Sequence, residues 1–147
     1  MANKSFGLEQ VLKYRKEVEK ARKLEFTAAQ QEIEGACERL KDEESRVDRL
    51  NAEFLYRQRE GTTAMELQIY SDFFRRKILD INRQRQETAT LNDMMTEKRY
   101  ILIEAAMEKK VLETLKEKKA KAHMRELLDK ERTFLEEIAL RKKGHGK

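Results

Sequence analysis

The chain contains no proline, and its 147 residues include only five glycines. Proline costs about 3 kcal/mol in a helix interior and glycine about 1 kcal/mol, so a chain almost free of both can form very long helices. One short patch around Gly61 interrupts the helical pattern. The sequence therefore predicts a helix over about residues 6–59, a turn at 60–64, a helix over about 65–141 and a tail at 142–147.

The composition fits either disorder or helices with one narrow apolar seam. Hydrophobic residues make up 39% of the chain, charged residues 41%, and the mean hydropathy is −0.90. Disorder predicts few apolar side chains and no periodicity. Here, in contrast, Leu, Ile, Val, Met and aromatic residues recur at helical spacing. We therefore predict long helices that bury little surface per residue.

Apolar and small residues in the first predicted helix recur mostly at spacings of three and four, which is typical of a coiled coil. Near Ala28 the register shifts, which predicts a stutter. Glu43 occupies a position where an apolar side chain is expected, so it either specifies the register or faces another protein. The predicted seam comprises Leu8, Val11, Tyr14, Val18, Ala21, Leu24, Ala28, Ala29, Ile33, Ala36, Leu40, Val47, Leu50 and Phe54.

A single reversal of the chain at Gly61 defines the predicted fold. Gly61 suits the position after a helix, where φ is positive. Thr62 or Thr63 can cap the second helix, and Glu66 lies three residues after Thr63, as in a capping box. Ser5 can cap the first helix. The predicted fold is all-α, a single domain over residues 1–147 that forms a long antiparallel two-helix coiled-coil hairpin, with the second helix overhanging the first. A continuous parallel dimer without the turn is the alternative.

The overhang and the charge distribution both point to partners. Residues from about 119 to 141 should extend past the start of the first helix, and an exposed apolar surface there suggests a surrounding partner. Residues 1–24 carry seven Lys and Arg against three Glu, and residues 109–147 carry thirteen against seven acids. The hairpin would then have one basic end, unless these charges only form a solvated surface.

No constellation of residues suits catalysis or metal binding. The two histidines, His123 and His145, and the one cysteine, Cys37, form neither a zinc site nor a Cys–His nucleophile pair. The tail lacks the GxxxxGK[ST] spacing of a phosphate-binding loop. We therefore expect a protein that is not an enzyme and that has no catalytic residue, no cofactor and no metal site.

Membranes and nucleic acids are not expected as direct partners. The basic run from Lys109 to Arg125 could contact phosphates, but Glu113 and Glu117 lie within it and no aromatic residues are interleaved. No stretch approaches the roughly 20 apolar residues that cross a bilayer. The first residues lack the apolar core of a signal peptide. We expect a cytoplasmic protein without direct membrane insertion.

Five of the ten aromatic residues gather next to the predicted turn. Phe73 and Phe74 are adjacent, about 100° apart on a helix, so one two-stranded seam cannot easily bury both. One of them should point outwards. The cluster is then either a docking site for another protein or an apolar plug that stabilises the turn. Its members are Phe54, Tyr56, Tyr70, Phe73 and Phe74.

Four parts of the chain together carry a recognisable pattern. The chain opens with Phe6-x-Leu8-x-x-Val11-Leu12-x-x-Arg15, and it turns at Gly61. The stretch over residues 108–118 fits the pattern E-x-K-x-L-E-x-L-K-E-K, and residues 131–139 are similar to E-x-x-x-L-D-E-x-A, with Glu136 in place of the usual Asp. In order and spacing, these parts resemble the FliJ family of bacterial flagellar export proteins over nearly the whole chain.

The resemblance implies an antiparallel coiled coil like the central stalk subunit of rotary ATPases. It implies a soluble part of the flagellar type III export apparatus, located peripherally at the cytoplasmic side of the inner membrane. The paired terminal end would bind the hexameric export ATPase and promote its assembly and activity. The turn end would bind the cytoplasmic domain of the membrane export gate.

The same resemblance implies residues for both contacts. For the ATPase ring they are Leu8, Leu12, Arg15, Leu127, Leu128 and Leu135. For the export gate they are Leu50, Phe54, Tyr70, Phe73 and Phe74. Two alternatives stay open: an escort or holdase module for export chaperones and their substrates, and a basic coiled coil that binds nucleic acid or a membrane surface.

Overall fold

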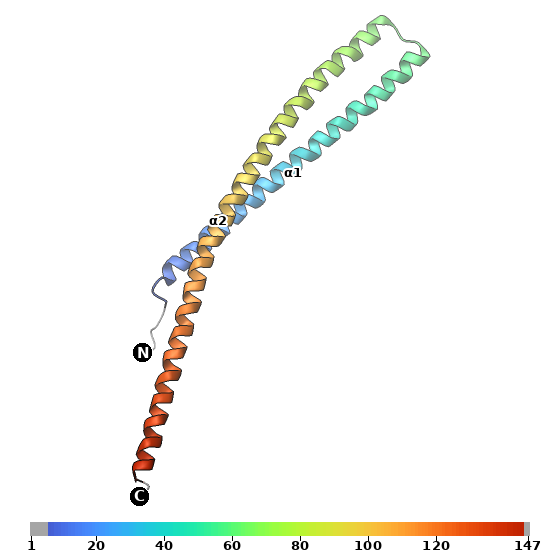
Figure 1. Cartoon of the computed structure of the whole chain (residues 1–147). Coiled ribbons are helices and arrows are strands. Elements are labelled where there is room, and N and C mark those ends of the chain that lie inside the picture. Colours follow the sequence, from blue (N-terminus) through green and yellow to red (C-terminus); the bar gives the residue numbers. More distant parts are fainter. Residues whose placement is uncertain (1–5, 146–147) are drawn as a thin grey trace. The chain divides into compact units, whose positions relative to one another are not determined.

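The structure, a computed structural model, describes residues 6–145 and confirms the predicted all-α hairpin. Helix α1 spans Glu9–Glu60, helix α2 spans Ala64–His145, and the turn between them is short (Figure 1). Helix α2 continues past its predicted end, because Gly144 lowers helix propensity by only about 1 kcal/mol and does not end the helix. The predicted cap Ser5 lies outside the described residues.

The turn has the geometry that its residues predict. Gly61 has a φ of 99°, a left-handed conformation that residues with a Cβ rarely adopt. The Thr63 hydroxyl accepts a hydrogen bond from the Glu66 amide at 3.2 Å. The Glu66 carboxylate in turn accepts a hydrogen bond from the Thr62 hydroxyl at 2.7 Å. These bonds satisfy groups at the start of α2 that would otherwise lack partners.

The described residues form two compact units. We call residues 6–20 and 104–145 the terminal unit and residues 21–103 the turn unit. In each unit a stretch of α1 pairs with an antiparallel stretch of α2. The assignment of the whole chain to one domain stays a prediction.

One set of buried and half-buried residues on α1 alternates by three and four residues without interruption and without a stutter near Ala28. The half-buried residues Glu9, Val18, Glu25, Gly35 and Glu44 lie beside this set. Of the predicted seam residues before Ala28, Leu8, Val11, Tyr14, Ala21 and Leu24 are exposed, whereas Val18 is half-buried. Charged side chains take their place, because their long stems can lie along apolar surface while their ends form ion pairs. The observed seam of α1 comprises Leu12, Arg15, Glu19, Arg22, Phe26, Ala29, Ile33, Ala36, Leu40, Glu43, Val47, Leu50 and Phe54.

The seam of α2 follows the same alternation. It begins next to the turn and mixes apolar side chains with several polar ones. At three of the polar seam positions, Lys77, Lys98 and Lys109, the lysine pairs with a glutamate of α1. The observed seam of α2 comprises Leu67, Tyr70, Phe74, Lys77, Ile81, Gln84, Thr88, Leu91, Met95, Lys98, Leu102, Ala105, Lys109 and Leu112.

The terminal unit has a thin apolar core that ion pairs complete. Leu12, which is 1% exposed, and Ala105 are its buried apolar residues within the described range. Ion pairs then join α1 to α2 across this core. They are Arg15 with Glu108, Glu19 with Lys109 at 2.7 Å and Glu9 with Lys116 at 2.9 Å.

In the turn unit, a charged pair lies within the seam. Ile33, Ala36 and Ile81 are the buried apolar residues of this unit. Beside them, the Lys77 ammonium donates a hydrogen bond to the Glu43 carboxylate at 2.6 Å. The Glu43 side chain is only 14% exposed. This burial favours a role in specifying the register over a role as a surface for another protein.

Candidate protein-docking surfaces

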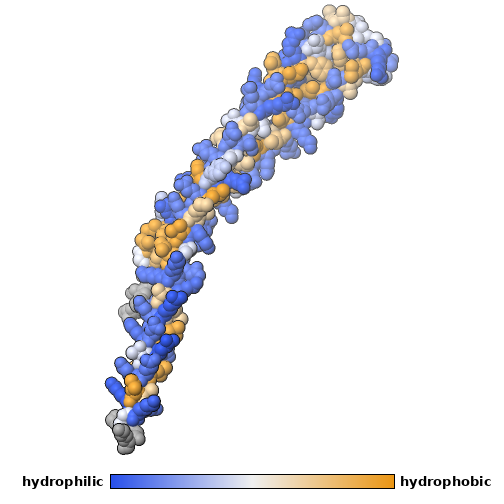
Figure 2. Space-filling view, viewed as in Figure 1, coloured by the Kyte–Doolittle hydropathy of each residue, from blue (hydrophilic) through white to orange (hydrophobic). Residues whose placement is uncertain are grey.

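The last part of α2 extends beyond its contacts with α1. Within the described residues, the contacts nearest to this part are the Glu9–Lys116 ion pair and the Lys119 ammonium, 5.9 Å from the centre of the Phe6 ring. From residue 124 to residue 143 the side chains are exposed, except that of half-buried Ile138. We call residues 124–143 the overhang. Figure 2 shows apolar and polar side chains mixed along it.

The apolar side chains of the overhang share one face. They are spaced by three, four or seven residues, which places them on one side of a helix. Leu140 is also exposed but lies on the opposite side. A single helix leaves such a stripe uncovered, as expected for a segment that packs against another chain. The stripe comprises Met124, Leu127, Leu128, Phe134, Leu135 and Ile138.

The three residues expected at the start of the first helix for the ring contact have different surroundings. Leu8 is exposed, whereas Leu12 is buried against α2 and cannot offer its side chain to a partner in this structure. Arg15 is half-buried and pairs with Glu108. The terminal unit therefore brings Leu8 and Arg15 to its surface and uses Leu12 to hold α1 in place.

The aromatic residues at the turn form a half-buried cluster. The Phe54 ring lies 5.2 Å from that of Tyr70 and 5.7 Å from that of Phe74, in tilted and edge-to-face arrangements. Phe73 lies beside Phe74 at 6.5 Å, and the Lys77 ammonium lies 5.6 Å from the centre of its ring. Both adjacent phenylalanines are half-buried, so neither is fully exposed. Their neighbours cover each ring in part.

Other apolar side chains of the turn unit are more exposed than this cluster. Tyr56, Met65 and Ile69 lie close to the turn, and each is well exposed. Sequence reasoning did not single out Met65 or Ile69. Their spacing of four residues places both on a helix face away from the seam, and this spacing could have identified them from the sequence. Leu50, the remaining residue expected at the gate contact, is half-buried in the seam.

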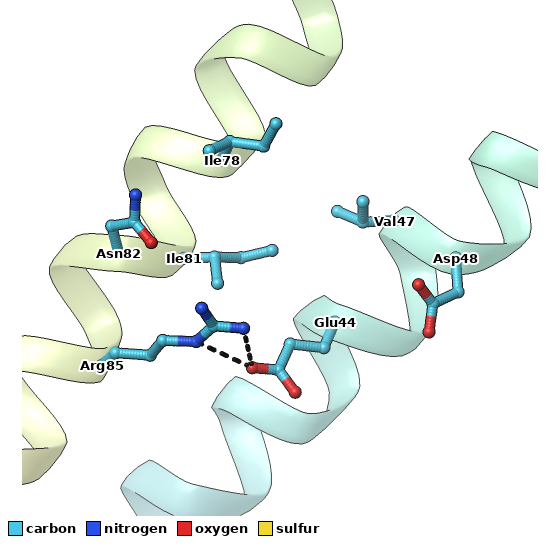
Figure 3. A pocket seen from close by; sticks show the side chains of 7 residues that line it. All are labelled: Glu44, Val47, Asp48, Ile78, Ile81, Asn82 and Arg85. Atoms are coloured by element: carbon cyan, nitrogen blue, oxygen red, sulfur yellow. Dashed lines mark hydrogen bonds and ion pairs between the residues drawn. The ribbon is translucent and has the colours of Figure 1, made fainter.

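An open groove of about 360 Å³ lies between the helices of the turn unit (Figure 3). Val47, Ile78 and Ile81 supply its apolar sides. At its polar edge, the Arg85 guanidinium donates hydrogen bonds of 3.2 and 3.0 Å to the Glu44 carboxylate. The groove could accommodate an apolar side chain of a partner, but it offers no enclosed, dry site of the kind that perturbs catalytic groups.

Within the part of the chain that the structure describes, the shifted pKa values belong to ion pairs between the helices. The hydrogen bond from Lys77 lowers the pKa of Glu43, and that from Lys116 lowers the pKa of Glu9. The hydrogen bond to Glu19 raises the pKa of Lys109. In each case the partner stabilises the charged form more than partial desolvation disfavours it. These shifts are those of structural ion pairs.

Within residues 6–145, no three or more His, Cys, Asp and Glu side chains lie together in a way that could hold a metal ion. Neither helix, over its described length, contains a stretch apolar enough to cross a membrane.

Comparison with known proteins provides one match. The sequence model of the family described as flagellar FliJ protein matches residues 4–146. No curated protein and no solved structure matches the chain. The family match covers almost all of the 147 residues, and it confirms the resemblance carried by the opening motif, the turn and the two later stretches. The chain therefore belongs to the FliJ family and is a component of the flagellar export apparatus.

Proposed function

We propose that this chain is a non-enzymatic stalk that joins the hexameric export ATPase to the membrane export gate. The terminal unit would bind the ATPase ring, and the turn end would bind the cytoplasmic domain of the gate. The observation that supports this most is the uncovered apolar stripe of the overhang in a chain that belongs to a family of export components. An apolar stripe of this kind is expected to be covered in the working assembly.

The proposed ring contact uses the overhang together with the start of α1. Leu127, Leu128 and Leu135 would insert between apolar side chains of the ring. Leu8 and Arg15 would add contacts at the start of α1, while Leu12 would hold that segment against α2. Asymmetric contact between a single hairpin and six ATPase subunits would bias the subunits through successive nucleotide states. Location at the cytoplasmic side of the inner membrane follows from the two proposed partners.

The ring contact is tested by ATP hydrolysis. Adding the wild-type chain to the export ATPase should raise both the hydrolysis rate and the fraction of hexamers. The double variant Leu127→Glu with Leu135→Glu should abolish the increase, because it places charges in the stripe. Leu140→Glu, the same change on the opposite face of the overhang, should retain it. No increase with the wild-type chain, or equal effects of both variants, would count against the proposed contact.

The gate contact would use the half-buried cluster of Leu50, Phe54, Tyr70, Phe73 and Phe74. Phe73→Ala is the most informative change, because Phe73 does not stack on Phe54 and its loss should leave the centre of the cluster intact. This variant should bind the gate's cytoplasmic domain more weakly while retaining its effect on the ATPase. Equal binding by the variant and the wild-type chain would exclude Phe73 from the contact.

The exposed Tyr56, Met65 and Ile69 favour a second candidate function, an escort for export chaperones and their substrates. Exposed aromatic and methionine side chains suit adaptable binding of several partners. If the escort role is correct, Tyr56→Glu with Ile69→Glu should prevent capture of an export chaperone and leave ATPase stimulation unchanged. Unchanged capture would dismiss the escort role.

A further inference from the structure

The terminal unit carries a second apolar face beside its seam. On α1, Tyr14 is 59% exposed and Val11 is also exposed; on α2, Val111 is 60% exposed and Leu115 is also exposed. We call the surface formed by these four residues the lateral face. Apolar side chains, orange in Figure 2, gather where α1 begins. The lateral face shares no residue with the contacts proposed above for the ring and the gate.

One ion pair shows how the two helices are rotated about their axes and on which side of the unit the four residues lie. Arg15 of α1 pairs with Glu108 of α2, and the Arg15 guanidinium lies 5.7 Å from the centre of the Tyr14 ring. Because an α-helix has 3.6 residues per turn, Val11 and Tyr14 of α1 lie on the side of Arg15 that is away from buried Leu12. The α2 members likewise lie on the side of Glu108 away from the seam residue Leu112. All four therefore lie on one side of the unit.

Two residues of opposite charge on α2 lie at equal sequence distances from Val111, which forms the middle of this face. Glu104 precedes Val111 by seven residues, and Lys118 follows it by seven residues. Seven residues make about two helical turns, so both side chains share the face with Val111. Both are exposed, and within the described range no ion pair involves either of them. A central apolar residue with an acid on one side and a base on the other is complementary to itself after a rotation of 180°.

We propose that the lateral face binds a second copy of this chain across a two-fold axis next to Val111. The two α2 helices would be antiparallel, with Glu104 of each copy facing Lys118 of the partner subunit. Val111 would contact Val111 of the partner subunit, and the Tyr14 rings would cover the sides of this apolar centre. The two ion pairs would set the register, and the apolar centre would supply most of the affinity. The small size of the face implies a weak, reversible dimer.

Sedimentation equilibrium over a range of concentrations tests the proposal. The mass of the wild-type chain should rise from 17.5 kDa toward twice that value as its concentration increases. Glu104→Lys and Lys118→Glu should each weaken the dimer at least about tenfold, since like charges then face each other. An equimolar mixture of the two variants should dimerise again, because each ion pair then joins opposite charges. Circular dichroism should show unchanged helicity, since both residues are exposed.

A matched control separates the lateral face from general effects of charge. Lys110→Glu makes the same change at an exposed lysine of α2 that lies about 140° around the helix from Leu115. It should leave the dimer unchanged. The proposal is overturned if the wild-type chain stays monomeric at every concentration, if Lys110→Glu acts like Lys118→Glu, or if the mixture of single variants does not dimerise.

The methyl resonances of valine give a direct second measurement. The chain has four valines: Val11, Val18 and Val111 lie in the terminal unit, and Val47 lies in the turn unit. In a valine-labelled sample, the resonances of Val11 and Val111 should shift with protein concentration, while that of Val47 should not. Self-association that shifts Val47 and leaves Val111 unchanged would place the dimer contact elsewhere and refute the proposal.

Discussion

Replacing Leu12 with alanine tests the observed seam of α1 most directly. Leu12 is 1% exposed, so the substitution removes three carbon groups that are fully shielded from water. At about 0.8 kcal/mol for each buried CH₂ group, the lost transfer free energy is about 2.4 kcal/mol. A cavity that α1 cannot fill by moving closer would add to this loss. We expect the free energy of opening residues 9–20 to fall by about 2 to 3 kcal/mol.

Hydrogen exchange measured by mass spectrometry is the appropriate assay, because it reports opening of one segment without requiring global unfolding. At about 1.4 kcal/mol for each factor of ten, a loss of about 2 to 3 kcal/mol corresponds to exchange about 30- to 150-fold faster over residues 9–20. Leu24→Ala is the matched control on the same helix. Leu24 is 71% exposed, so the same chemical change should alter stability by no more than about 0.5 kcal/mol.

Two results would refute this reasoning. If Leu24→Ala accelerates exchange as much as Leu12→Ala does, the seam follows the apolar residues that the sequence first indicated. If Leu12→Ala has no effect, the start of α1 is not held against α2 by apolar burial. Either result would also remove the basis for assigning the lateral face.

The turn and the charged seam pair give the remaining predictions. Gly61→Ala should destabilise the hairpin by about 1 kcal/mol, because φ is 99° there although no neighbouring atom blocks a Cβ. The same change inside α1, Gly35→Ala, should stabilise it by about 0.5 to 1 kcal/mol, and thermal unfolding of both variants should show opposite signs. Each single change, Glu43→Lys or Lys77→Glu, should lower the melting temperature, and the double variant that exchanges the two charges should recover most of that loss. A double variant as unstable as the single variants would exclude a direct pair. Because Lys77 lowers the pKa of Glu43, this pair stabilises the fold above the ordinary glutamate pKa and ceases to do so as pH falls through the lower folded value. Glu43→Gln should therefore reduce the loss of stability below about pH 4.3, and identical acid profiles for variant and wild type would contradict the assignment.

The helices and the turn could be predicted from the sequence because they depend on local chemistry. The absence of proline allows two long helices, and a glycine with a positive φ ends the first of them. The Thr63 cap depends on a contact between residues three apart. The apolar stripe of the overhang was also predictable, because α1 does not compete for that part of α2.

Four of the eleven residues expected at partner contacts make contacts within the chain that the sequence did not reveal. Leu12 is buried, and Phe54, Tyr70 and Phe74 stabilise one another at the turn. Sequence spacing identifies which residues share a helix face. It does not say whether another helix of the same chain already covers that face.

The start of α1 shows where the sequence alone was insufficient. Two sets of residues there have the spacing of a seam: an apolar set that includes Val11 and Tyr14, and a mostly charged set that includes Arg15 and Glu19. Counting apolar residues favours the first set, and the sequence-based prediction followed it. In the structure the second set faces α2. One reason is that Glu108 and Lys109 of α2 lie opposite Arg15 and Glu19 and carry the opposite charges. Another is that the three-and-four spacing of the seam then continues along α1 without a shift. Local pattern determined that this segment is a helix, whereas its packing against α2, through buried Leu12 and the ion pairs, determined which of its faces is inside.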